Sequence, residues 1–186
     1  MPSIAVVTAV RPARDLAHRL LADRPERLQH TAGVAQRAAE LRPAVGDDEE
    51  HETLVAAAWL HDIGYADALH DTGFHPLDGA RHLDREGWPR RLSALVAHHS
   101  GACFVARARG LDEALRAYPR EDSPVADALT YADQTVGPGG IRMDVRCRMA
   151  DMLHRHGPAS ANAVVHHVRG PYLLAVADRV EHRLTR

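Results

Sequence analysis

The chain has 186 residues and a formal net charge of −2, and 45% of its residues are hydrophobic. The balanced charge argues against a basic surface for binding a nucleic-acid duplex. All 23 basic residues are arginine, which excludes a lysine-dependent phosphate loop and a lysine Schiff base. No apolar run approaches the length of about 18 residues that marks a membrane-spanning helix. Alanine and leucine are abundant, which predicts an all-α fold, with residues 1–186 forming a single domain.

The two cysteines and the N-terminal segment bear on where the protein resides. Cys103 and Cys147 lie far apart and form no C-x-x-C pair, so we expect a reducing, cytoplasmic environment. The apolar run from Ile4 to Val10 is short, has no basic stretch before it and is followed by Arg11. It predicts a strand or an extended lead-in rather than a signal peptide.

Helical segments separated by proline and glycine follow along the rest of the chain. Gly64 is expected to stop the third helix, and Ser123-Pro124 to open the helix that ends before the glycine-rich loop 137–140. The spacing of apolar residues predicts helices over 13–22, 25–41, 53–63, 76–86, 90–99, 111–117, 124–133, 144–156 and 171–184.

Histidine is unusually frequent in this sequence, with 14 residues. His61 and Asp62 both fall on apolar stripes of the third predicted helix, where two polar groups are costly unless they are paired or bind a metal. His30, His99 and Asp133 also fall on or beside apolar faces. Imidazole and carboxylate ligands without thiolate suit Fe, Mn, Ni or Zn. Asp62 is the best placed to bridge two metals about 3.5–4 Å apart.

The order of these residues resembles the HD superfamily of metal-dependent phosphohydrolases, and in particular the branch with the ligand pattern H…HD…H…H…D. In this chain the pattern is formed by His30, His61, Asp62, His75, His99 and Asp133. The resemblance covers about residues 24–140 and is carried by the segments RLQHTAGVAQRAAEL, AAAWLHDIGYA, GFHPLDGARHL, LVAHHS and ALTYADQTV. Bacterial HD proteins that split diadenosine tetraphosphate show a similar series.

The resemblance implies an HD-type helical bundle with a motif-bearing core over 24–140 and closing helices over 144–184. It implies one or two divalent transition metals (Fe, Mn, Ni or Zn). The first metal would be held by His30, His61 and Asp133, the second by His75 and His99, and Asp62 would bridge them. The substrate would be a nucleotide or another small phosphate ester, hydrolysed by a metal-activated water, with no membrane or nucleic-acid partner.

The sequence also departs from the family pattern. Tyr65 stands where many HD hydrolases have a lysine after H-D-x-G, so a lysine contact to phosphate is missing. No Gly-Tyr-Pro motif follows the second histidine pair, which argues against the cyclic-dinucleotide branch.

Several roles stay open between two interpretations. Arg27, one turn before His30, is either a contact to a substrate phosphate or a surface salt bridge. Glu26 is either a further metal ligand or a solvated carboxylate at a helix start. Adjacent helical residues point about 100° apart, so we expect His99 to be the ligand and His98 a substrate contact or proton donor. Seven further histidines are expected at the surface: His70, His82, His154, His156, His166, His167 and His182.

Two other functions are compatible with the same ligands. A few HD proteins hold two irons and use O₂ to cleave an organic phosphonate or a polyol. Other HD modules are non-catalytic regulators with a structural metal, although these generally lack one or more ligands. Oxygen uptake would indicate the oxygenase, and anaerobic phosphate release would indicate the hydrolase.

Overall fold

The computed structural model describes residues 9–186, and these residues form helices and no strand, which confirms the predicted all-α class. The strand or extended segment expected over residues 4–10 falls outside the described residues as far as residue 8. Its last residue, Val10, begins the first helix. The helices are α1 (Val10–Leu20), α2 (Pro25–Glu40), α3 (Asp48–Leu60), α4 (His75–Arg85), α5 (Arg90–His98), α6 (Ala102–Ala108), α7 (Asp112–Leu115), α8 (Pro124–Gln134), α9 (Val145–His156), α10 (Ala161–Val164) and α11 (His166–Leu184).

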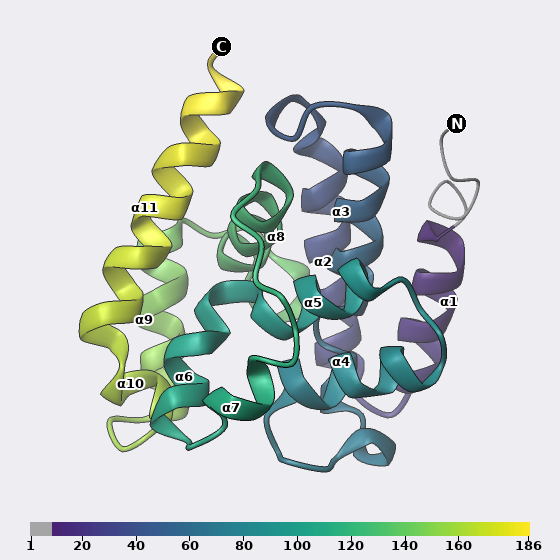
Figure 1. The fold of residues 1–186 in the computed structure, drawn as a ribbon. Coiled ribbons are helices and arrows are strands. Elements are labelled where there is room, and N and C mark those ends of the chain that lie inside the picture. Colours follow the sequence, from purple (N-terminus) through teal and green to yellow (C-terminus); the bar gives the residue numbers. More distant parts are fainter. Residues whose placement is uncertain (1–8) are drawn as a thin grey trace.

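Helix α3 lies in the middle of the bundle and packs against α1, α2, α5 and α8. Helix α8 in turn packs against α11, so that α1 and α11 stand at opposite sides of the molecule (Figure 1). The core is built largely from alanine and leucine side chains, among them Leu54, Leu60 and Leu129, each 0% exposed. The small side chains of the buried alanines allow the helices to approach one another closely.

All nine predicted helices are present, and their bounds differ for local reasons. Helix α3 begins five residues earlier than predicted, because the Asp47 side chain accepts a hydrogen bond from the Glu50 backbone N–H and the first turn is acidic. Helix α11 also begins earlier, at His166, and contains Pro171 within its length. The predicted N-cap at Ser123 is confirmed, since its side chain accepts from the Ala126 backbone N–H.

Two short helices, α6 and α10, were not predicted. Neither is long enough to show a hydrophobic period in the sequence. Among the described residues, no helix combines the length and the apolar character needed to cross a membrane.

Candidate metal centre

The His61-Asp62 pair lies just beyond the end of α3, rather than inside the helix as predicted. Helix α3 ends at Leu60, His61 keeps helical dihedral angles, and Asp62 leaves the helical path with φ −108° and ψ 5°. Because consecutive helical residues point about 100° apart, this departure lets both side chains face the same buried space. His61 is 0% exposed and Asp62 is 3% exposed.

A second helix end separates His98 from His99. Helix α5 ends at His98, and the chain then turns through Ser100, whose φ of 53° is left-handed. His99 is buried in the cluster, whereas Nε2 of His98 bonds the carbonyl oxygen of Tyr118 at 2.8 Å. His98 does not line the cavity beside the other candidates. The structure therefore does not bring His98 to the position that a substrate contact or proton donor needs.

The other three predicted ligands come from three different helices. His30 lies in α2, His75 begins α4, and Asp133 lies in the last turn of α8. His30 and Asp133 are buried, while the side chain of His75 is 22% exposed. The structure thus brings all six predicted ligands into one cluster.

Asp62 stands between the histidines, and its two carboxylate oxygens face different pairs of them. Oδ2 lies 3.7 Å from His30 Nε2 and 3.4 Å from His61 Nε2. Oδ1 lies 3.3 Å from His75 Nε2 and 4.0 Å from His99 Nε2. A carboxylate divided in this way is placed to bridge two cations about 3.5–4 Å apart.

Asp133 completes the cluster on the His30 side. Its Oδ1 lies 3.0 Å from His30 Nε2 and 3.8 Å from His61 Nε2. The ligand atoms of His30, His61 and Asp133 all lie within 4.8 Å of one another, and so do those of His61, Asp62 and His99. These donors, nitrogen and oxygen without sulfur, suit a divalent transition metal.

Backbone carbonyl groups determine which ring nitrogen of three histidines faces the cluster. Nδ1 of His30, His61 and His99 lies between 2.6 and 3.1 Å from a main-chain carbonyl oxygen. A carbonyl oxygen can only accept, so Nδ1 carries the proton, and Nε2 of the neutral ring presents its lone pair to the cluster. Nε2 of His61 is buried and has no hydrogen-bond partner. This orphaned nitrogen and the donor set fit a metal ion.

Asp133 is oriented by two residues that the sequence analysis missed. Ser100 Oγ and Gln134 Nε2 both donate to Asp133 Oδ2, the latter at 3.0 Å, which leaves Oδ1 facing the histidines. The backbone N–H of Ser100 donates to Thr130 Oγ1 at 3.1 Å and so ties the left-handed turn to α8. Their only signal in the sequence is that each directly follows a predicted ligand.

Arg27 forms a partly buried salt bridge at the cluster rather than one at the surface, and its contact to a substrate phosphate stays a prediction. Its Nη1 donates to Asp62 Oδ2 at 2.8 Å, and its guanidinium lies 4.0 Å from the centre of the Tyr65 ring. The Tyr65 ring stacks on His75 with centroids 4.0 Å apart and an angle of 17°. Tyr65 thus orients both a charged group and a candidate ligand. Glu26 is exposed at the start of α2 and takes no part in the cluster.

Gly64 serves close packing and does not stop a helix, because α3 already ends at Leu60. A Cβ atom at Gly64 would lie 2.0 Å from the His75 carbonyl oxygen and 2.7 Å from the Gly79 nitrogen. The approach is close from the other side as well, since a Cβ at Gly79 would lie 3.2 Å from the Gly64 nitrogen. This close approach fixes His75 next to Asp62.

Burial and charge act in opposite directions on the ionisable groups of the cluster. Burial favours the neutral carboxyl, but the neighbouring cations outweigh it and hold the pKa values of Asp62 and Asp133 well below the usual range. Burial lowers the pKa values of His75 and His99. Burial also disfavours the charged form of His61, but the charges of Asp62 and Asp133 raise its pKa to about 9.

The raised pKa of His61 predicts how metal uptake and stability depend on pH. A histidine has a pKa of about 6.5 in an unfolded chain, and in the folded, metal-free protein the pKa of His61 is about 9. The stability from its protonation is therefore fully present below pH 6.5 and is lost as pH rises to about 9. We expect the melting temperature of the metal-free protein to fall over this interval. A metal must displace the same proton, so its affinity should rise about tenfold per pH unit.

Thermal melts and metal titrations between pH 6.5 and 9 measure both effects. His75 and His99 have lowered pKa values and stay neutral over this interval, so they do not contribute. The variant His61→Gln is the control, and its melting temperature should not show the same decline. A decline of equal size in the variant would show that another group is responsible.

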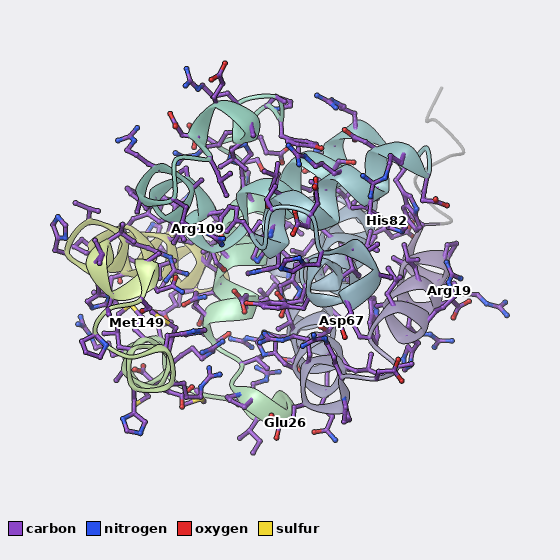
Figure 2. The ribbon with its side chains drawn as sticks, turned by 90° about the horizontal axis from the view of Figure 1, so that it is seen from below. Arg19, Glu26, Asp67, His82, Arg109 and Met149 are labelled. Carbon is purple, nitrogen blue, oxygen red and sulfur yellow. The ribbon has the colours of Figure 1, made fainter. Side chains whose placement is uncertain are left out.

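A cavity of about 450 Å³ lies beside Asp62, His75, His99 and Asp133. This volume is in the range of small-molecule sites. Its walls carry several arginines, namely Arg27, Arg109, Arg148, Arg155 and Arg169. Seen from below, Arg109 and Met149 lie on the left of the molecule and Glu26 lies at its lower edge (Figure 2). His156, expected to be an ordinary surface residue, also lines the cavity.

The family model of the HD domain matches residues 27–136, more than half of the chain. The chain belongs to the HD domain family. The matched residues of this HD-domain protein include all six predicted metal ligands, whereas α9, α10 and α11 lie outside the match. Neither the comparison with curated proteins nor the comparison with solved structures gave a significant match.

Proposed function

We propose that this HD-domain protein is a metal-dependent phosphohydrolase that acts on a small phosphate ester such as a nucleotide. The observation that carries the proposal is the placement of the two carboxylate oxygens of Asp62. Oδ2 faces His30 and His61, and Oδ1 faces His75 and His99. HD domains are typically phosphohydrolases of this metal-dependent kind. The arginine-lined cavity beside the cluster suits an anionic substrate.

The ligands divide into two sets around Asp62. His30, His61 and Asp133 would hold one divalent metal, and His75 and His99 would hold a second, with Asp62 shared between them. Metals in these positions would polarise a phosphoryl oxygen and lower the pKa of a coordinated water. Fe, Mn, Ni and Zn all suit these nitrogen and oxygen ligands.

The protein's own side chains supply position and charge. Arg27 is fixed by Asp62 and by the face of Tyr65, and its guanidinium lines the cavity. There it can bind oxygens of the phosphoryl group and stabilise the negative charge that develops on them. Ser100 and Gln134 hold Asp133 in place, and the carbonyl groups hold the histidine rings, so little reorganisation is needed on substrate binding.

The test is metal analysis of the purified chain, followed by a phosphate-release screen. The metal-free protein is loaded in turn with Mn²⁺, Fe²⁺, Ni²⁺ or Zn²⁺ and assayed under anaerobic conditions against nucleotides and simple phosphate esters. We expect phosphate release that depends on the metal. Oxygen consumption with an organic phosphonate or polyol, without anaerobic hydrolysis, would instead indicate the di-iron oxygenase. Metal binding without either activity would indicate a regulatory module.

The division of ligands predicts that the two metals can be lost separately. His75→Ala and His99→Ala should each lower occupancy of the second metal and leave the first bound, because His30, His61 and Asp133 still surround it. Metal content per chain, measured by elemental analysis after gel filtration, should fall from two to one. His98→Ala is the matched control, because His98 lies beside His99 and bonds Tyr118 away from the cluster. Equal metal content in all three variants would contradict the two-metal arrangement.

A further inference from the structure

Two arginines of the cavity wall come from the segment that lies outside the family match. Arg148 lies in α9 and Arg169 in α11, and these helices pack against each other beside the matched region (Figure 1). Both arginines line the cavity next to Asp62 and Asp133. This segment thus contributes charge directly to the site of the proposed reaction.

Both guanidinium groups are buried without a full set of partners. Arg148 is 8% exposed and Arg169 is 7% exposed, and Nη1 of each is buried with no hydrogen-bond partner. The carboxylate nearest to Arg148, that of Asp151, lies 3.6 Å from Nη1, and among the described residues Arg169 forms no ion pair. A buried cation is costly unless an anion compensates it. Within residues 9–186, Arg169 therefore has no anion to compensate its burial, and Arg148 shares Asp151 with Arg155.

The other arginines of the wall are already engaged. Arg27 is paired with Asp62 and Arg155 with Asp151. Arg109 donates to the carbonyl oxygens of Gly73 and Thr72. Among the buried arginines of the wall, Arg148 and Arg169 are therefore the ones whose charge is least compensated.

Hydrogen bonds fix both arginines relative to the metal ligands. Nε of Arg169 donates at 2.8 Å to the carbonyl oxygen of Ser100, the residue whose hydroxyl donates to Asp133. Nε of Arg148 donates at 2.8 Å to the carbonyl oxygen of Val136, three residues after Asp133. In both cases Nε is used by the backbone and the outer nitrogens remain for a ligand. These hydrogen bonds thus fix both guanidinium groups relative to the cluster of candidate ligands.

We propose that Arg148 and Arg169 form an anion subsite that binds a second phosphoryl group of the substrate, separate from the one that is cleaved. A guanidinium binds phosphate oxygens through two N–H groups, and two guanidinium groups suit a doubly charged phosphoryl group. The substrate is then a molecule with at least two phosphoryl groups. The assignment to a substrate rests on the proposed function, whereas the subsite itself rests on the two buried arginines.

The test measures anion binding to the full chain from which metal has been removed by chelation and dialysis. Inorganic phosphate and tripolyphosphate are titrated by calorimetry into the wild-type protein, Arg148→Gln, Arg169→Gln and the control Arg146→Gln. Arg146 is exposed on the same helix as Arg148. We expect tripolyphosphate to bind the wild type more tightly than phosphate, and each cavity variant to weaken its binding about tenfold or more. The control should bind as the wild type does.

The outcomes separate the subsite from the proposed reaction. Unchanged tripolyphosphate binding in both cavity variants, or no binding to the wild type, would overturn the subsite. Wild-type binding that depends on the two arginines, in a protein that hydrolyses no ester with any metal, would keep the subsite and reject the proposed function. In an active enzyme, Arg169→Gln should raise KM about tenfold for a diphosphate ester and leave KM for a monophosphate ester within about twofold. Equal effects on both esters would overturn the role of the subsite in substrate choice.

Discussion

Asp62→Asn should abolish binding of both metals and lower any phosphohydrolase activity by about 10³-fold or more. Each oxygen of Asp62 faces one pair of histidines, so replacing the carboxylate removes a charged ligand from both sets at once. An amide has one oxygen and a donating NH₂ group, so it cannot bridge two cations. Elemental analysis and initial rates with added metal measure the two losses together.

The matched control for this variant is Asp67→Asn. Asp67 lies a few residues further along the chain, is exposed and pairs with Arg24 rather than with the cluster. Its metal content and rate should equal those of the wild type. Because Asp62→Asn also leaves Arg27 without its partner, circular dichroism must show that the variant is folded. A folded Asp62→Asn protein that keeps both metals would contradict the bridging role.

The sequence predicted which residues gather in the cluster better than it predicted the geometry that joins them. The six candidate ligands, the all-α class and most helices could be read from composition, apolar spacing and family resemblance. The sequence did not show that α3 ends before His61 or that α5 ends before His99. Helix ends depend on tertiary contacts, whereas periodicity only reports which face a residue takes inside a regular helix.

The residues around the ligands were harder to predict for a related reason. The hydrogen bond from Ser100 to Asp133 depends on a left-handed turn, and the stacking of Tyr65 on His75 depends on two segments meeting in space. Arg148 and Arg169 lie in helices that the family pattern does not cover, and their separation from the cluster in sequence hides their nearness to it. Local spacing carries no information about such long-range contacts. The sequence placed His98 in the site because it adjoins His99, whereas the end of α5 separates the two side chains and His98 bonds the Tyr118 carbonyl oxygen.

Gly64→Ala should destabilise the protein by about 3 kcal/mol, because an added methyl group that meets fixed backbone has no room. Its Cβ would lie 2.0 Å from the His75 carbonyl oxygen and 2.7 Å from the Gly79 nitrogen, so α4 must move away from the turn. That movement also carries His75 away from Asp62 Oδ1, now 3.3 Å from its Nε2. We therefore expect loss of the second metal together with the loss of stability.

Urea unfolding of the metal-free protein and metal content per chain measure these two consequences of Gly64→Ala. Gly170→Ala is the control, because the three atoms nearest to its Cβ, at 3.0 to 3.4 Å, all belong to the side chain of the half-buried His166, which can shift more easily than backbone. An alanine within helix α11 is expected to change stability by less than about 1 kcal/mol in either direction. If Gly64→Ala lost stability but kept both metals, the His75 side chain would remain beside Asp62 even when α4 moves. If it kept both properties, the close approach of the turn to α4 would not be what holds His75 in place.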